Sequence, residues 1–242
     1  MNVFELVKFN LIDRFKKIST YIGFLLVLLF PILYVISQVK YHQSVDGHVI
    51  AILGQWTFGF LGLMLIIATL VRDSSQGTIQ LYLNSKENRI KYFISQFISV
   101  VIIGLITSIV LIIATLILQS TAKGPHLPSD EIGHIICIHI SLFMFYGLFL
   151  FLIMLLFKSS ALSFSLGVFI MLIIPIATNL IPLVPKYGST IEKILKYVPF
   201  NFLVSKLWSG ELALNHWQLI ITIGSIILLI IIDLFVITKK DY

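Results

Sequence analysis

Long runs of apolar residues alternate with short polar segments along the whole chain. Six runs each hold about 20 mostly apolar residues, the length that a helix needs to cross the hydrocarbon core of a membrane. The runs cover residues 20–38, 50–71, 93–118, 135–157, 161–183 and 217–237. The pattern predicts an all-α integral membrane protein with six transmembrane helices in a single domain, residues 1–242.

The first 17 residues carry six charges, too many for a membrane span. Four apolar residues share a narrow arc of a helix at about 100° per residue: Phe4, Val7, Leu11 and Phe15. We expect residues 1–17 to form an amphipathic helix in the membrane interface, with its apolar face towards the lipid. The alternative is an ordinary amphipathic helix packed on another domain.

Residues 184–216, between the last two apolar runs, contain two short helical patterns. Ser189 and Glu192 have the spacing of a capping box, and Pro199 ends the first pattern. A second amphipathic stretch ends at Gly210. We expect a pair of short helices that enters the outer leaflet or covers a cavity. A loosely packed surface hairpin is the alternative, and re-entry into the bilayer stays open.

The longest polar interruption on the more basic side of the chain is residues 72–92, RDSSQGTIQLYLNSKENRIKY. It separates the second apolar run from the third. Ile79, Leu81, Tyr82 and Leu83 form a compact apolar contact within this otherwise polar segment. Such a pattern suits a surface that meets another protein. The alternative is a merely solvated basic loop.

Composition supports a membrane protein. The chain has a mean hydropathy of +1.03 and 12% charged residues, against about 25% in soluble domains. The net charge of +6 agrees with Lys and Arg flanking membrane helices on the cytoplasmic side, and no basic patch with interleaved aromatic residues indicates nucleic-acid binding. The single cysteine, Cys137, excludes an internal disulfide. No cleavage site follows the first apolar run, so we expect a retained first span.

The distribution of Lys and Arg predicts the orientation. With the N-terminus inside, eleven of these residues fall on inner segments and six on outer segments. We therefore expect both termini and the 72–92 segment to be cytoplasmic.

Catalytic and metal-binding patterns do not emerge. His134 and His139 are five residues apart, about 140° around a helix, so they cannot readily face one ion. The sequence contains no P-loop, no G-x-S-x-G and no H-E-x-x-H. We expect a chain that is not itself an enzyme and binds neither a cofactor nor a metal.

Polar residues within the apolar runs are costly and often functional. Asp233 is the one acid inside a run, and we expect a structural pairing with Arg72 or a terminal lysine; a proton relay is the alternative. Asn179 caps a broken helix or contacts a substrate. Gln55 and Trp56 anchor and pack the second span, or line a substrate path.

Small residues also predict a helix contact. Ser159, Ser163 and Gly167 recur every four residues around the start of the fifth run. This spacing places them on one helix face and lets another helix approach closely. We expect this face to serve packing, with no chemistry.

The 72–92 segment resembles the cytoplasmic loop of type-2 ATP-binding-cassette (ABC) transporter permeases. The residues that match the family's sequence pattern are Asp73, Gly77, Thr78, Leu81, Leu83, Ser85, Arg89 and Tyr92. Ser75 stands where an acid is common, and Asn84 lies near the place of the usual proline. The order of elements resembles the family along nearly the whole chain, including residues 196–200, KYVPF, before the last span and the Lys-Lys-Asp ending.

This resemblance implies a short coupling helix in the segment, docked in a groove of a separate cytoplasmic ATPase that binds ATP and Mg²⁺. The docking residues are expected to be Asp73, Gly77, Thr78, Ile79, Leu81, Tyr82, Leu83, Lys86 and Arg89. Gly77 would allow a close approach and Thr78 would cap the following turn.

The resemblance further implies an ABC exporter in a bacterial cell membrane. The chain would pair with a second permease, identical or similar, and move a hydrophobic or amphipathic cargo. The expected class is a peptide, such as a peptide toxin, a lantibiotic, bacitracin or a phenol-soluble modulin, and export of sodium or a polysaccharide stays open. The alternative is an ATP-independent secondary transporter, or a membrane component that transports nothing.

Overall fold

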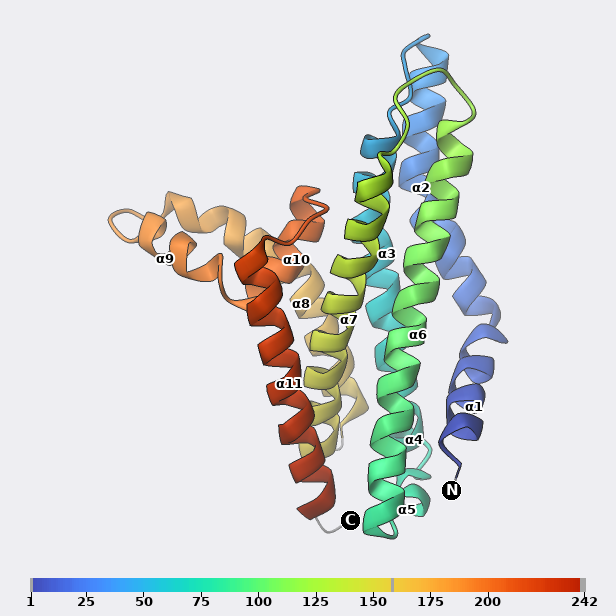
Figure 1. Ribbon diagram of the computed structural model, residues 1–242, viewed down its shortest axis with the longest axis vertical. Coiled ribbons are helices and arrows are strands. Elements are labelled where there is room, and N and C mark those ends of the chain that lie inside the picture. The colour runs from blue at the N-terminus through green and yellow to red at the C-terminus, as the bar shows by residue number, and fades with distance from the viewer. Residues whose placement is uncertain (1, 158, 240–242) are drawn as a thin grey trace.

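A computed structural model describes residues 2–157 and 159–239, and all regular structure in these ranges is helical. Six helices are long and apolar enough to cross a membrane (Figure 1). They are α2 (Ile18–Lys40), α3 (Gly47–Leu70), α6 (Lys86–Gln119), α7 (Ser129–Phe157), α8 (Ser160–Leu180, extended by the 3-10 helix η1, Ile181–Leu183) and α11 (His216–Lys239). The prediction of an all-α chain with six such helices is confirmed.

Each of these helices begins before its apolar run, and two of them, α6 and α7, begin more than a full turn earlier. α6 starts at Lys86 because the Ser85 hydroxyl accepts a hydrogen bond from the Asn88 N–H and caps its first turn. Its 34 residues make a helix of about 50 Å, against about 30 Å of hydrocarbon core. The polar first turns of α6 would therefore extend beyond a membrane. α7 likewise begins at Ser129, with Asp130 and Glu131 in its first turn.

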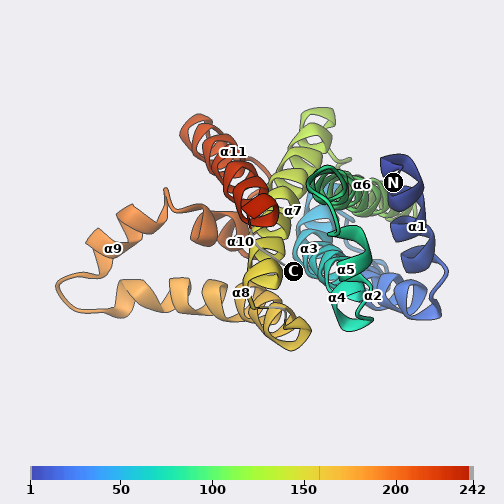
Figure 2. The ribbon, with the colours of Figure 1, turned by 90° about the horizontal axis from the view of Figure 1, so that it is seen from below.

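α3 is the centre of the bundle (Figure 2). It packs against α2, α6, α7 and α8, and most of its residues are buried. The predicted packing face on α8 is present, since Ser163 is buried and Gly167 lies against α3. A Cβ atom on Gly167 would stand 2.1 Å from Ile67 Cδ1, so a larger residue would require the Ile67 side chain of α3 to move.

The N-terminal helix α1 (Val3–Phe15) runs beside α6 at the end of the bundle that also holds the last turn of α11 (Figure 1). Its buried residues are Val7, Asn10 and Arg14, so the face that meets the protein is partly polar. Phe4 and Phe9 are exposed. The residues of the expected apolar arc therefore do not share one environment, because Val7 is buried in the protein whereas Phe4 is exposed.

Two short helices, α9 (Gly188–Leu195) and α10 (Pro199–Ser209), connect α8 to α11. α9 projects sideways from the bundle, whereas α10 packs against α8, α3 and α7 (Figures 1 and 2). The expected capping box is wrong: the helix begins at Gly188, one residue before Ser189, and its cap residue Tyr187 makes no side-chain hydrogen bond. α10 ends where Gly210 adopts the left-handed conformation, as its position predicts.

Candidate functional site

The 72–92 segment forms two single-turn helices and the first two turns of α6. α4 (Arg72–Ser75) follows α3 directly, and α5 (Ile79–Tyr82) precedes Leu83 to Ser85. Gly77 separates the two turns with φ at +69°, a conformation that costs an L-residue energy and a glycine nothing. Gly77 therefore lies between α4 and α5, and the turn that follows Thr78 is α5.

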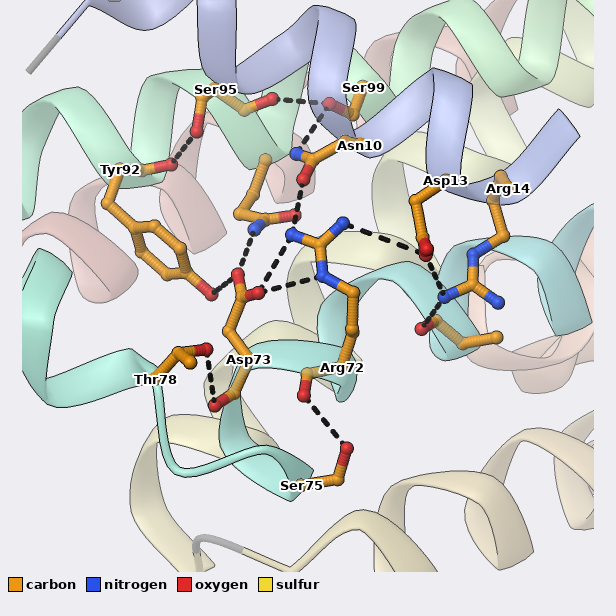
Figure 3. Close-up of polar contacts among 12 residues, drawn as sticks. Asn10, Asp13, Arg14, Arg72, Asp73, Ser75, Thr78, Tyr92, Ser95 and Ser99 are labelled. Atoms are coloured by element: carbon orange, nitrogen blue, oxygen red, sulfur yellow. Dashed lines mark hydrogen bonds and ion pairs between the residues drawn. The ribbon is translucent and has the colours of Figure 1, made fainter. Parts of the chain in front are cut away.

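Asp73 is the hub of a buried polar network at the base of the segment (Figure 3). Its Oδ1 accepts from Arg72 Nε at 2.8 Å, and its Oδ2 accepts from the Tyr92 hydroxyl at 3.0 Å and from Gln96 Nε2 at 3.4 Å. Only 2% of Asp73 and 5% of Arg72 is exposed. A buried ion pair is strong only when further hydrogen bonds satisfy both partners. Asp73 meets that condition, whereas Arg72 Nη1 has no hydrogen-bond partner within the described residues and lies 3.8 Å from Asp13 Oδ2.

Arg72 carries the network into α1. Its Nη2 donates to Asn10 Oδ1 at 2.7 Å, and Asn10 Nδ2 donates to Ser99 Oγ of α6 at 3.0 Å (Figure 3). The guanidinium also lies 4.6 Å from the centre of the Phe9 ring, within the range of a cation–π contact. One arginine thereby links α4, α1 and α6.

Arg14 adds a second tie between α1 and the bundle. Its Nη2 donates to the main-chain carbonyl of Ala68 near the end of α3. Its own carbonyl accepts from the Thr20 hydroxyl at 2.8 Å, which fixes the turn into α2. Burial lowers the pKa of the Arg14 guanidinium from its usual value, while neighbouring Asp13 opposes the shift.

The base of the segment is fixed and its tip is exposed. Leu83 is buried, and its carbonyl accepts from Arg89 Nε at 2.8 Å. Arg89 Nη1 also donates to the Thr238 carbonyl of α11 at 3.3 Å. Leu81, by contrast, is 71% exposed. Of the expected docking residues, Asp73 and Leu83 therefore support the segment from within, and Leu81 stands on its surface.

The remaining expected docking residues differ in their exposure to solvent. Ile79 and Tyr82 are half-buried against the core, where the Tyr82 ring stacks on Tyr92 at 5.5 Å between ring centres. Lys86 is exposed. The expectation that Thr78 caps the next turn is wrong, because its hydroxyl donates back to the Asp73 carbonyl at 3.3 Å. A Cβ atom on Gly77 would meet nothing within 4 Å, so its φ alone requires glycine in this structure.

The three expected path residues do not line one cavity. Gln55 is fully buried and its Nε2 donates to the Glu211 carbonyl at 3.4 Å. The Trp56 indole donates to the Met171 carbonyl of α8 at 3.3 Å, and the ring faces an apolar groove of about 320 Å³ between α2 and α3. Asn179 lines a different, polar cavity beneath α9 and α10. Gln55 and Trp56 thus join α3 to its neighbours.

Of the partners expected for Asp233, Arg72 is wrong, because Arg72 pairs with Asp73 and Asp13. Asp233 is fully buried in α11, and within the described ranges neither of its oxygens has a hydrogen-bond partner. Lys240, one of the terminal lysines considered, lies outside the residues that the structure describes.

Sequence reasoning missed Asn10, Gln96 and Ser99, which complete the network around Arg72 and Asp73. A signal for Asn10 exists, because it shares a helix face with Val7 and Arg14 at spacings of three and four. Ser95 and Ser99 likewise share a face of α6 one turn apart. A polar stripe on a helix next to a polar loop indicates such a buried cluster.

A family model described as a protein of unknown function, DUF2705, matches residues 30–242. No curated protein matches the chain at a significant level. The matched range covers the last part of α2, from residue 30, and every later helix, and it therefore includes the 72–92 segment.

Proposed function

Since the chain belongs to the DUF2705 family of proteins of unknown function, we propose from its own geometry that it is the permease subunit of an ABC exporter. The observation that carries this proposal is the contrast within the 72–92 segment. Its base is held by a buried ion pair in contact with α1, α4 and α6. Its tip presents Leu81 to solvent. The same chain has six helices long and apolar enough to cross a membrane.

The exposed tip fits a docking element for a cytoplasmic ATPase. Leu81 is the exposed apolar residue of the tip, and half-buried Ile79 and Tyr82 flank it. Lys86 adds an exposed cation close by. An apolar anchor with a charged rim is the arrangement in which a few residues supply most of the binding energy.

The buried base fits the transmission of force. A push on the tip reaches Asp73, which is hydrogen-bonded to α6 through Tyr92 and Gln96. Arg72 passes the same displacement to α1 through Asn10. Elements joined in this way move together as a rigid body, so ATP-driven closure of two ATPases would rock the spans and alternate access to the two sides.

The setting that we propose is the bacterial cell membrane, with both termini and the 72–92 segment in the cytoplasm. Eleven Lys and Arg against six support this orientation. The exposed face of α1, with Phe4 and Phe9, would lie in the inner interface. A second permease would complete the transporter.

The cargo that we propose is hydrophobic or amphipathic, with a peptide as the favoured class. The groove between α2 and α3 supports an apolar cargo, because Phe30, Trp56 and Phe60 line it and almost no polar surface does. ATP and Mg²⁺ would bind the partner ATPase, since this chain contains no P-loop.

Co-purification tests this proposal. The tagged chain, expressed in its native host, is expected to retain an ATPase, and Leu81→Asp is expected to release it while the melting temperature stays unchanged. Asn84→Asp, an exposed change in the same segment, is the matched control. A chain that never retains an ATPase, or that exports normally with Gly77→Trp, would overturn the proposal.

Asp233 favours a second candidate, an ATP-independent transporter coupled to protons. A buried acid with no hydrogen-bond partner among residues 2–157 and 159–239, inside a potential span, is the kind of residue that relays protons in pumps and carriers. Transport that follows a proton gradient, ignores ATP depletion and stops in Asp233→Asn would support this candidate over the exporter.

A further inference from the structure

A polar cavity of about 280 Å³ lies at the end of the bundle opposite α4 and α5. It is open to the surface on one side, and its lining residues come from α8, α9, α10, the first turn of α11 and the chain between them; Figures 1 and 2 show how these helices are arranged. The polar side chains that line it include Thr178, Glu192, Lys196, Asn201, Lys206 and Gln218. This concentration of polar groups stands between helices whose outer faces are apolar.

Two nearly buried amides fix the shape of this cavity. Gln218 Nε2 donates to the Lys196 carbonyl at 3.0 Å, and Asn201 Nδ2 donates to the Leu195 carbonyl at 3.4 Å. The Thr178 hydroxyl donates to Asn201 Oδ1 and joins α8 to the same framework. The end of α9 is therefore held from three helices. A cavity shaped in advance costs a ligand less ordering on binding.

The charges of the cavity are balanced. Lys206 pairs with Glu211, donates to the Ala213 carbonyl at 2.9 Å, and leaves only 12% of its side chain exposed. Glu192 and Lys196 also line the cavity, one helical turn apart, and neither belongs to an ion pair within the described residues. One free carboxylate and one free ammonium thus face the same space, which complements a ligand that carries both signs of charge.

The surroundings of the cavity place it at the level of lipid headgroups. Trp208 and Trp217, at the ends of α10 and α11 next to it, are both partly exposed, and tryptophans concentrate at membrane–water interfaces. Exposed apolar residues on α8, such as Ile176 and Leu180, extend away from the cavity. A ligand with a polar head and apolar chains matches both surfaces.

We propose that this cavity binds the headgroup of a zwitterionic phospholipid, with the acyl chains along the exposed apolar face of α8. The headgroup ammonium would meet Glu192, and the phosphate would meet Lys196. The site is independent of any transport activity.

Native mass spectrometry of the purified full chain in detergent tests this inference. Phosphatidylethanolamine is expected to be retained on the order of tenfold more than diacylglycerol with the same chains, and more than anionic phosphatidylglycerol. Glu192→Gln and Lys196→Gln are each expected to reduce its retention on the order of tenfold, the effect of one lost charge-assisted hydrogen bond.

Lys193→Gln is the matched control, because Lys193 is an exposed residue of α9 outside the cavity lining. Melting curves verify the fold of each variant. Equal retention of diacylglycerol, stronger retention of the anionic lipid, or variants that behave like the control would overturn the proposal. So would displacement of the phospholipid by an amphipathic helical peptide, which would assign the cavity to cargo.

Discussion

The hydroxyl of Tyr92 donates a hydrogen bond to the Asp73 carboxylate at 3.0 Å, although the two residues are 19 positions apart. Both side chains are almost completely buried. The bond joins the start of the 72–92 segment to its end and closes the loop at its base. The exposed tip is consequently carried on a fixed support.

Replacing Tyr92 with Phe isolates this bond, because the ring that stacks on Tyr82 remains. We expect a loss of about 1.5–3 kcal/mol in the free energy of unfolding, the range for a hydrogen bond to a charged group. Unfolding of the purified protein in mixed micelles measures it. Tyr21→Phe, at an exposed tyrosine, should change nothing; equal effects at both positions would contradict the assignment.

The pair formed by Arg72 and Asp73 gives a prediction for two changes made together. Arg72→Met alone leaves a buried carboxylate without its counter-charge and is expected to cost about 3–5 kcal/mol. Adding Asp73→Leu is expected to recover only part of that loss. It removes the unpaired buried charge, but it leaves the buried Tyr92 hydroxyl and Gln96 amide without their acceptor. The same unfolding measurement decides. A double variant as unstable as Arg72→Met would show that the pair is not the main interaction.

Gly77 and Gly133 allow a matched test of backbone conformation. An added Cβ atom would meet nothing within 4 Å at either position, but only Gly77 has a positive φ. Gly77→Ala is expected to cost about 1–2 kcal/mol, whereas Gly133→Ala, inside α7, is expected to stabilise by up to about 1 kcal/mol. Protease digestion of the segment, alongside melting temperatures, would detect the difference. Similar effects would mean that the left-handed turn does not persist in solution.

The same substitution at two buried acids has opposite expected results. Asp73→Asn removes the charge that Arg72 requires and is expected to destabilise the protein by about 3 kcal/mol or more. Asp233→Asn removes no described contact and is expected to leave stability unchanged or raise it, because an unpartnered carboxylate is costly to bury. Comparison of the two unfolding free energies tests this. Equal losses would reveal an ionic partner for Asp233.

Much of the fold follows from local patterns that survive in any tertiary context. An apolar run of about 20 residues satisfies its backbone only as a helix in a membrane, and each of the six runs lies within one long helix. Gly210 ends α10 for an equally local reason, its left-handed conformation. The packing face of α8 that consists of small residues could also be predicted from the sequence, because a glycine such as Gly167 lets another helix come close.

The candidate site could be predicted only in part. Residues 72–92 are visible as a polar interruption with an apolar contact, yet their sequence does not separate buried Asp73 and Leu83 from exposed Leu81. Burial depends on which helices pack nearby. Asn10 and Ser99 are 89 positions apart and meet only because α1 lies along α6.

Sequence alone therefore determined the number of apolar helices, their helical state and the polar segment between the second and third, because these properties depend on near neighbours and on solvent. Tertiary structure alone decided which charges pair. Asp233 had Arg72 and the terminal lysines as candidate partners by its place in the chain, and packing gave Arg72 to Asp73 instead. Ion pairs require specific atoms within a few ångströms, and the crossing of helices sets that distance.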